Sequence, residues 1–409
     1  ISLLKCGLWG THPTAAEFAQ ADWPTIVKIA KEQCVTALIT DAMNELAAGG
    51  VPIDKPLLYK INFDAVRIAQ RNAQLNATLA EITELLNANN IPPVLLKGQG
   101  VAQDYRKPEQ RMSGDIDLYV GEANYKKAIG ILQHSGNQEV LQNPACVMQK
   151  SNETVKHYHM QYGDLQVELH KFANYLYNPI ENRYFQRLTK KYLQNPACAK
   201  HTSDILQHSG NQAVLQSCGT TSKNTISQSS GNQTVLQNPA CVMQKIQTPP
   251  PQFDAVFLFS HLFHHYLSGG IGLRQLCDWV RLLYMHKNEI DTTQLGTDLK
   301  KTGLLRAWKI FGYIAVDTLG LPTDFFPFYE RREEQGEKVL ERIYQGGNFG
   351  YYNPENGSRP KGYITGKLHS LKNSTRNYLK IFNLFPKATL TYFFHHLIIG
   401  TAQIFKEKF

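Results

Sequence analysis

The sequence predicts an α+β protein, in which a small mixed sheet lies between a helical N-terminal segment and a helical C-terminal domain. Apolar residues recur with helical spacing before residue 90 and again after residue 253. Between these parts, the stretch 91–175 holds short apolar or alternating runs bounded by glycine, asparagine and serine, a pattern that is typical of strands.

The composition is that of an ordinary globular chain and limits the number of domains. Of the 409 residues, 42% are hydrophobic and 19% are charged, which excludes a collagen, a coiled coil and a largely disordered chain. At roughly 150 residues per domain, the length fits two or three domains. We expect an N-terminal helical segment (1–90), a mixed-sheet core (91–175), a repeat-containing insertion or linker (176–252) and a C-terminal helical domain (253–409).

Charge, cysteines and hydropathy limit the partners and the compartment. The net charge of +9 suits a ligand with phosphate groups, a nucleic acid or an anionic membrane surface. The seven cysteines form no CxxC pair, which argues against a disulfide framework or a zinc ribbon. No secretory signal opens the chain, so we predict a cytoplasmic protein. The apolar stretch 390–404 has 15 residues, fewer than the roughly 20 that span a bilayer, so we expect no transmembrane segment.

Two helices of the N-terminal segment have clear signals. Asp22 is placed to cap a helix that has Pro24 in its first turn. A second helix presents one apolar face, formed by Leu75, Leu79, Ile82 and Leu86.

Near-identical segments recur in the middle of the chain. LQHSGNQEVLQNPACVMQK (132–150) returns as SQSSGNQTVLQNPACVMQK (227–245), with partial copies at 193–200 and 206–216. Their irregular spacing does not fit a solenoid. Two interpretations stay open, a duplicated surface insertion or a stretch whose sequence was assigned imperfectly, and we predict no function for these segments.

A pair of aspartates in the core carries the strongest chemical signal. Asp115 and Asp117 are two residues apart on a predicted strand, so their carboxylates project from the same face. Two acids this close are best explained by a shared cation. Ligands that are all oxygen favour Mg²⁺, which completes its shell with water and substrate phosphates.

A third carboxylate, Glu168, is expected beside this pair. It lies on the second strand of a hairpin predicted to turn at Gly163-Asp164, and in a mixed sheet that strand can lie next to 115–120. Three carboxylates can hold two cations, which serve the attacking and the leaving oxygen of an in-line displacement. His170, on the same face as Glu168, is either a partner of the acids or an exposed imidazole.

Residues around the aspartates are suited to bind phosphate. Lys97 and Gly98 end the preceding strand, where the glycine lets backbone N–H groups approach a phosphate and the lysine adds charge. Arg111 and Ser113 would supply further donors to phosphate.

Two residue pairs on helices of 253–285 have alternative interpretations. Arg274 and Asp278 have the i, i+4 spacing of a helix ion pair, or they face a cleft between these helices and the core, where Arg274 would bind nucleotide. His261 and His265 could bind a metal, but aromatic neighbours and the lack of a nearby acid favour core or interface histidines.

Together, these motifs resemble the polymerase-β-type nucleotidyltransferase superfamily, whose signature is a strand, a glycine-rich turn, a helix and Asp-x-Asp on the next strand. The chain is more closely similar to a family known only as uncharacterised nucleotidyltransferases. The matching positions are LLKG (95–98), Tyr105, Pro108, Arg111, DIDLYV (115–120), VELH (167–170) and GIGLRQLCDW (270–279). The resemblance covers roughly 1–175 and 253–350, and the repeats fall outside it.

This resemblance implies an activity and a set of metal ligands. The chain would move a nucleoside monophosphate from an NTP, with ATP as the expected donor, to an unidentified acceptor hydroxyl and release pyrophosphate. The reaction would depend on Mg²⁺ or Mn²⁺, with Asp115, Asp117 and Glu168 as the ligands. Residues 91–175 would form the nucleotidyltransferase core.

The turn after the first strand departs from the superfamily pattern. The superfamily usually has Gly-Gly or Gly-Ser there, whereas this chain has Lys97-Gly98-Gln99. The departure supports the alternative that the protein keeps the fold but only binds a nucleotide or a partner. The basic charge also leaves nucleic acid as a partner, although no RNA-recognition or zinc-finger motif accompanies it.

Overall fold

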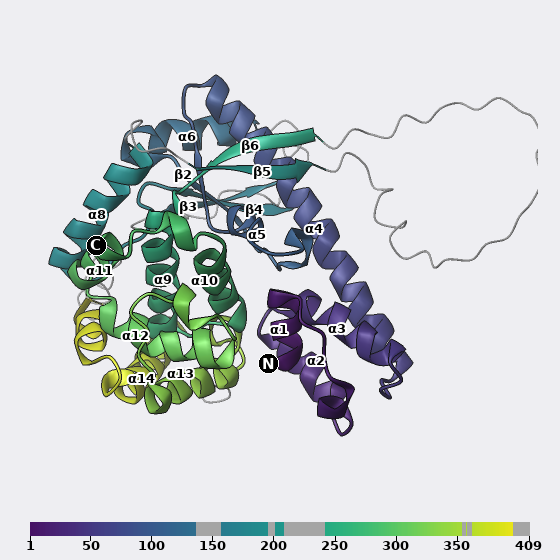
Figure 1. The fold of residues 1–409 in the computed structure, drawn as a ribbon. Helices are drawn as coiled ribbons and strands as arrows, with labels where there is room; N and C mark the ends of the chain where they lie inside the picture. Colours follow the sequence, from purple (N-terminus) through teal and green to yellow (C-terminus); the bar gives the residue numbers. More distant parts are fainter. Residues whose placement is uncertain (136–156, 195–200, 208–241, 354–356, 358–361, 396–409) are drawn as a thin grey trace, which may run out of the picture.

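A four-stranded sheet lies between helices from both ends of the chain (Figure 1). The computed structural model describes residues 1–135, 157–194, 201–207, 242–353, 357 and 362–395. Helices precede and follow the small mixed sheet, so the predicted α+β class is confirmed.

The N-terminal part of the chain is helical. Its helices are α1 (Ser2–Trp9), α2 (Trp23–Glu32), α3 (Thr36–Ala48) and α4 (Lys55–Ala88). The predicted cap is present, because Asp22 Oδ1 accepts a hydrogen bond from the backbone N–H of Thr25 at 3.2 Å. Between α2 and α3 the chain turns at Cys34, which has a φ of +57°.

Helix α4 connects the N-terminal helices to the sheet (Figure 1). Its 34 residues span about 50 Å at 1.5 Å per residue. The N-terminal part packs on α3, and the C-terminal part covers one face of the sheet. The apolar face predicted from the sequence is fully buried there, at Leu75, Leu79, Ile82 and Leu86.

The mixed sheet has the strand order β1-β2-β4-β3. Its strands are β1 (Val94–Leu96), β2 (Ile116–Tyr119), β3 (His157–Tyr162) and β4 (Leu165–His170). β2 and β4 are parallel neighbours, while β1 pairs with β2, and β3 with β4, in antiparallel fashion. The hairpin at Gly163-Asp164 and the placement of its second strand beside β2 are therefore confirmed.

The two faces of the sheet differ because side chains alternate along each strand. Ile116 and Leu118 of β2, with Val167 and Leu169 of β4, pack on α4 and on α6 (Gly121–Ser135). Asp117 and the residues in register with it therefore face the opposite side. The short helix α5 (Gln99–Ala102) follows β1.

The segment predicted as an insertion contains secondary structure that the sequence did not predict. After α8 (Pro179–Thr189), β5 (His201–Gln207) and β6 (Val242–Thr248) pair in antiparallel fashion, and β6 packs next to β1. The repeated segments lie largely outside the described residues.

The C-terminal part of the chain is helical and contains a cluster of packed aromatic rings. Its helices are α9 (Pro251–Ser268), α10 (Leu273–Met285), α11 (Thr292–Lys301), α12 (Leu305–Tyr313), α13 (Glu333–Gly346) and α14 (Tyr363–Phe382), followed by a helical stretch at 386–395. The rings of Trp279 and Trp308 lie edge to face with centroids 4.8 Å apart, and Phe259 packs against both. Among the described helices, none is long and apolar enough to cross a membrane.

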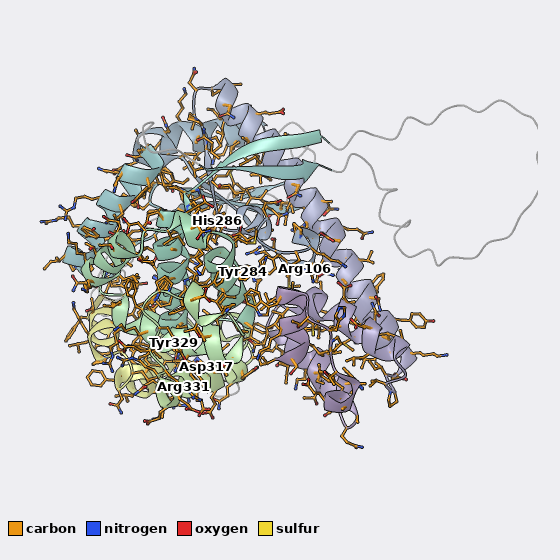
Figure 2. The ribbon with its side chains drawn as sticks, in the orientation of Figure 1. Arg106, Tyr284, His286, Asp317, Tyr329 and Arg331 are labelled. Carbon is orange, nitrogen blue, oxygen red and sulfur yellow. The ribbon has the colours of Figure 1, made fainter. Side chains whose placement is uncertain are left out.

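His286, labelled in Figure 2, lies at the end of α10 and contacts Asp104 in the chain after α5. Its Nε2 lies 2.9 Å from Asp104 Oδ1, and its Nδ1 lies 2.7 Å from Glu289 Oε1. Burial lowers the pKa of this imidazole, but the two carboxylates outweigh burial and raise the pKa of His286 to about 9.

We therefore expect the stability to decline between about pH 6.5 and 9. A histidine whose pKa rises on folding stabilises the folded state fully below its unfolded pKa of about 6.5, and this contribution is lost as the pH rises through about 9. His286→Gln should remove on the order of 1 kcal/mol of this decline in urea unfolding at the two pH values. An unchanged decline in the variant would contradict the assignment. Burial and the Asp104 carboxylate raise the pKa of the neighbouring Asp254 carboxyl well above its usual range, and the charge of His286 acts against this increase.

Candidate active site

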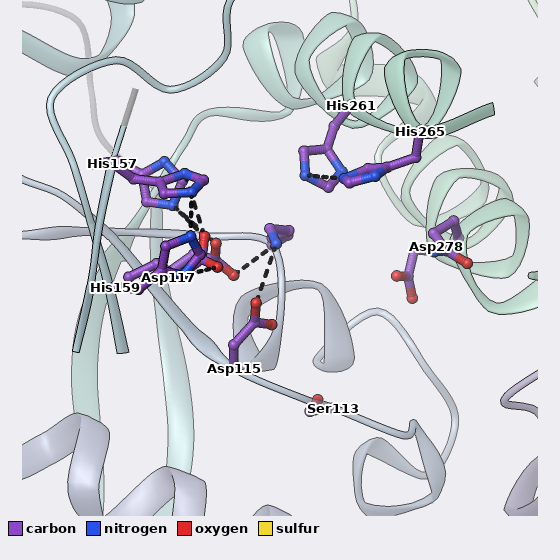
Figure 3. A network of polar contacts seen from close by, with 12 residues as sticks. Ser113, Asp115, Asp117, His157, His159, His261, His265 and Asp278 are labelled. Atoms are coloured by element: carbon purple, nitrogen blue, oxygen red, sulfur yellow. Dashed lines mark hydrogen bonds and ion pairs between the residues drawn. The ribbon is translucent and has the colours of Figure 1, made fainter. Parts of the chain in front are cut away.

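Three acidic side chains lie close together on the face of the sheet opposite α4 and α6. Figure 3 shows two of them, Asp115 and Asp117. Asp117 on β2 is in register with Glu168 on β4, and Asp115 lies two residues before Asp117 on the same face. One carboxylate oxygen from each of the three lies within 4.8 Å of the others, a spacing that could hold a metal ion. The residues that the sequence singled out as metal ligands are thus close together.

Lys97 folds back onto these acids from the end of β1. Its Nζ lies 2.9 Å from Asp117 Oδ2 and 3.9 Å from Asp115 Oδ2. Burial alone would lower the pKa of the Lys97 ammonium, but Asp117, Asp115 and Glu168 raise it above its ordinary value. Lys97 therefore carries a permanent positive charge in the middle of the acidic group.

Asp117 is ionised despite complete burial. Burial acts to raise the pKa of its carboxyl, but the Lys97 ammonium and a hydrogen bond from His170 outweigh burial and hold the pKa below its usual range. His170 Nε2 lies 2.9 Å from Asp117 Oδ1 and 3.3 Å from Glu168 Oε2. His170 is therefore a partner of the acids and not an exposed imidazole.

Asp115 borders a cleft of about 400 Å³ between the sheet and helices α9 and α10, where the sequence predicted a cleft. Asp115, Lys97 and Gly98 line its sheet side, and Arg274 and His261 line its helical side. Asp117 and Glu168 do not line the cleft themselves but lie next to Asp115, which does. The cleft could admit a ligand to the edge of the acidic group.

The side chain of Arg111 is buried and committed to protein partners. Its Nε and one terminal nitrogen each lie 2.7 Å from an oxygen of Asp278, and the other terminal nitrogen donates to the Ser113 hydroxyl at 2.6 Å. Tyr105 also donates to Asp278, at 2.7 Å. Arg111 thereby joins the strand region to α10, and it also belongs to the lining of the cleft.

Ser113 continues this network toward α4. Its hydroxyl donates to Gln99 Oε1 at 2.6 Å, and the Gln99 amide donates to Asn76 Oδ1 at 2.5 Å. Gln99 occupies the position where the superfamily usually has a small residue. Its side chain is buried and hydrogen-bonded to α4, so it holds the turn between β1 and α5 in place.

The structure distinguishes between the alternative interpretations of the two residue pairs on α9 and α10. Asp278 accepts from Arg111, while Arg274 donates to the carbonyl of Met112 at 2.7 Å and lines the cleft, so the cleft interpretation fits better than an i, i+4 pair. His265 and His261 have their Nε2 atoms 3.3 Å apart, and His261 also lines the cleft (Figure 3).

The turn between β1 and α5 requires glycine at position 98. Gly98 has a φ of +58° and a ψ of −125°, a backbone conformation that is essentially open to glycine alone. The neighbouring Lys97 has a φ of +48°, which directs its side chain back to the acids. A Cβ on residue 98 would meet no close contact, so the requirement comes from the backbone conformation.

Gly98→Ala is accordingly expected to destabilise the protein by about 1–3 kcal/mol and to shift Lys97 relative to the acids. Gly130→Ala is the matched control, because Gly130 lies within α6 with open space around its Cα. That change should stabilise the protein by about 0.5–1 kcal/mol. Urea unfolding of the two variants gives the comparison, and a neutral effect of Gly98→Ala would contradict it.

Sequence reasoning missed several residues of the site. His157 and His159 on β3 lie across from His170 and Glu168, and the alternating pattern of the predicted hairpin, read in register, could have placed them. The pairing of Asp278 with Arg111 joins residues 167 positions apart, and no local spacing predicts it.

The comparisons with known proteins agree with the resemblance noted from the motifs. The family model described as uncharacterised nucleotidyltransferase matches residues 19–320, which includes the sheet and helices α9 to α12 and, unlike the resemblance drawn from the motifs, also runs through the repeated segments. No curated protein and no solved structure matches the chain. The matched region covers well over half of the sequence, and it contains every acid of the site. The chain therefore belongs to the family of uncharacterised nucleotidyltransferases.

Proposed function

We propose that the protein transfers a nucleoside monophosphate from an NTP to an acceptor hydroxyl and releases pyrophosphate. The convergence of Asp115, Asp117 and Glu168 at the edge of a cleft carries this proposal. Asp117 and Glu168, in register on neighbouring strands, and Asp115 just before β2 suit a cation-dependent reaction on a phosphate, because bound cations offset the repulsion between the acids. Family membership supports the general transferase role.

The donor set fits Mg²⁺ or Mn²⁺. All three side chains offer carboxylate oxygens, the ligands that these hard cations take, and Asp117 keeps its negative charge at neutral pH because Lys97 and His170 offset burial. A bound magnesium ion would neutralise triphosphate charge and lower the pKa of the acceptor hydroxyl. Asp115, Asp117 and Glu168 would hold it.

The remaining residues of the cleft would bind and orient the substrates. The Lys97 ammonium, the backbone at Gly98 and the Arg274 guanidinium would contact the triphosphate of the donor, which we expect to be ATP. Ser113, which also lines the cleft, would contact the triphosphate through its hydroxyl. Arg111 would act mainly through Asp278, by holding α10 and the segment before β2 at a fixed separation.

In the transfer itself, the acceptor oxygen would form a bond to the α-phosphorus as the bond to the β-phosphate oxygen breaks. The hydroxyl proton would pass to Glu168, and pyrophosphate would leave with the electrons of the broken bond. Burial raises the pKa of the Glu168 carboxyl, but His170 and Lys97 outweigh burial and lower it, so Glu168 is ionised and able to accept a proton.

One observation favours a second candidate, a nucleotide-binding protein without catalysis. Lys97 already places a cation 2.9 Å from Asp117, so the acids are partly neutralised by the protein itself. In that case an NTP would bind in the cleft without turnover. Pyrophosphate release separates the two candidates.

A pyrophosphate-release assay with the four NTPs, in Mg²⁺ or Mn²⁺, tests the proposal. We expect release with at least one NTP, dependent on the added cation, and loss of release in the Asp115→Asn/Asp117→Asn double variant. Cation-dependent NTP binding without release, across a panel of small-molecule, sugar, protein and RNA acceptors, would favour the second candidate. Release that persists in the double variant would contradict the assigned site.

A further inference from the structure

The imidazoles of three histidines, His157, His159 and His170, lie next to the Glu168 carboxylate. The antiparallel register of β3 and β4 sets His157 opposite His170 and His159 opposite Glu168. Glu168 and His170 alternate along β4 with Val167 and Leu169, which face α4 and α6, so they project from the face that carries Asp117. The two histidines of β3 share this face because they lie directly opposite Glu168 and His170. Figure 3 shows the rings of His157 and His159 beside the acids.

Two of these imidazoles approach the same carboxylate oxygen at the spacing of metal ligands. His157 Nδ1 lies 3.4 Å from Glu168 Oε2, and His170 Nε2 lies 3.3 Å from it. In a tetrahedral site with bonds of about 2.0–2.1 Å, neighbouring ligand atoms are about 3.3–3.4 Å apart. The three ligand atoms lie within 4.8 Å of one another. The His157 and His170 side chains are only 10% and 4% exposed.

A hydrogen-bond chain through His159 orients two of these ligands, His157 and Glu168. His157 Nε2 lies 2.8 Å from His159 Nε2, and His159 Nδ1 lies 3.0 Å from Glu168 Oε1. In one consistent arrangement, His157 donates through Nε2–H to His159, and His159 donates through Nδ1–H to Glu168. The Nδ1 lone pair of His157 then faces Glu168 Oε2. This is how ligating histidines are usually held, with the second ring nitrogen bonded to a fixed partner.

We propose that His157, His170 and Glu168 form a second metal centre, which binds a borderline transition-metal dication such as Zn²⁺. Two imidazoles and one carboxylate suit Zn²⁺, Co²⁺ or Fe²⁺, whereas the oxygen-only group of Asp115, Asp117 and Glu168 suits Mg²⁺. The centre needs only these three side chains and does not depend on nucleotidyl transfer.

The two centres would be coupled through shared residues. Glu168 borders both, and His170 Nε2 also donates to Asp117. The same Nε2 atom of His170 would bind the dication, so its contact with Asp117 and its bond to the metal exclude each other.

Cobalt titration of the untagged protein, after removal of metals with a chelator, tests the centre. Co²⁺ in a site with imidazole ligands absorbs visible light, and no nucleotide is needed. We expect one Co²⁺ per chain, displaced by Zn²⁺ but not by millimolar Mg²⁺. His157→Gln should weaken Co²⁺ binding by about 10²-fold or more, whereas His12→Gln, at an exposed surface histidine, should leave it unchanged.

Other outcomes would overturn the proposal. Binding that survives in His157→Gln but is lost in His261→Gln would move the centre to α9, and absent Co²⁺ absorption in the wild type would leave the imidazoles as counter-ions of the acids. If His157→Gln does not fold, X-ray absorption of the Zn²⁺-loaded wild type decides, since two imidazole ligands are expected and fewer would contradict the centre. Asp115→Asn should keep Co²⁺ binding, so this test and that of nucleotidyl transfer can fail separately.

Discussion

Replacing Asp117 by asparagine is expected to lower NTP-dependent pyrophosphate release by on the order of 10³-fold or more. Asp117 is fully buried, and the pairing of β2 with β4 fixes it beside Glu168. An amide at this position keeps the shape but loses the charge that would bind a cation. The loss of several kcal/mol of transition-state stabilisation corresponds to this factor, at about 1.4 kcal/mol per tenfold.

The matched control for this variant is Asp164→Asn. Asp164 is exposed in the turn that joins β3 to β4, so the change removes one acid from the same hairpin without touching the acidic group. Its release rate should stay within about twofold of the wild type, because the charge of Asp164 is exposed to solvent and largely screened. Equal rates for Asp117→Asn and the wild type would show that the chemistry takes place elsewhere.

Replacing Asp278 by asparagine is expected to destabilise the folded protein by about 3–5 kcal/mol. Asp278 and Arg111 are both buried and joined by two hydrogen bonds of 2.7 Å. Burial acts to raise the pKa of Asp278, but Arg111 outweighs burial and holds it below its usual range. The asparagine would leave the guanidinium of Arg111 buried without a compensating charge, which is the costly way to break such a pair.

Urea unfolding of three variants, each compared with the wild type, checks this expectation. The exposed acid Glu334, paired with Lys338 at 2.7 Å on the surface of α13, is the control, and Glu334→Gln should cost less than about 0.5 kcal/mol. The double variant Arg111→Met/Asp278→Leu should recover much of the loss, because it removes both buried charges together. A cost for Asp278→Asn as small as that of the control would contradict the assigned role of this pair.

The sequence predicted the sheet and the acidic group because both follow from local periodicity. Asp115 and Asp117 share a face by the two-residue repeat of a strand, and the glycine turn at 163 fixes the hairpin that carries Glu168. Only the pairing of that hairpin with β2 needed a guess at tertiary structure, and the structure confirms it.

What escaped prediction depends on contacts between distant parts of the chain. The bond of Arg111 to Asp278 crosses from the sheet region to α10, and β5 pairs with β6 across a segment of unusual composition. The imidazoles of His157 and His159 meet Glu168 only in the antiparallel register of β3 and β4. Spacing along the sequence contains no information on such partners until the register is known.

The central claim, nucleotidyl transfer, is tested most directly by following the fate of the donor's phosphates. The protein is incubated with an acceptor mixture and with an NTP labelled either at the α-phosphate or at the γ-phosphate. Transfer of the nucleoside monophosphate predicts that the α-label moves to the acceptor, that the γ-label appears in pyrophosphate, and that both events require Asp117. A γ-label on the acceptor, or on free phosphate alone, would contradict the account.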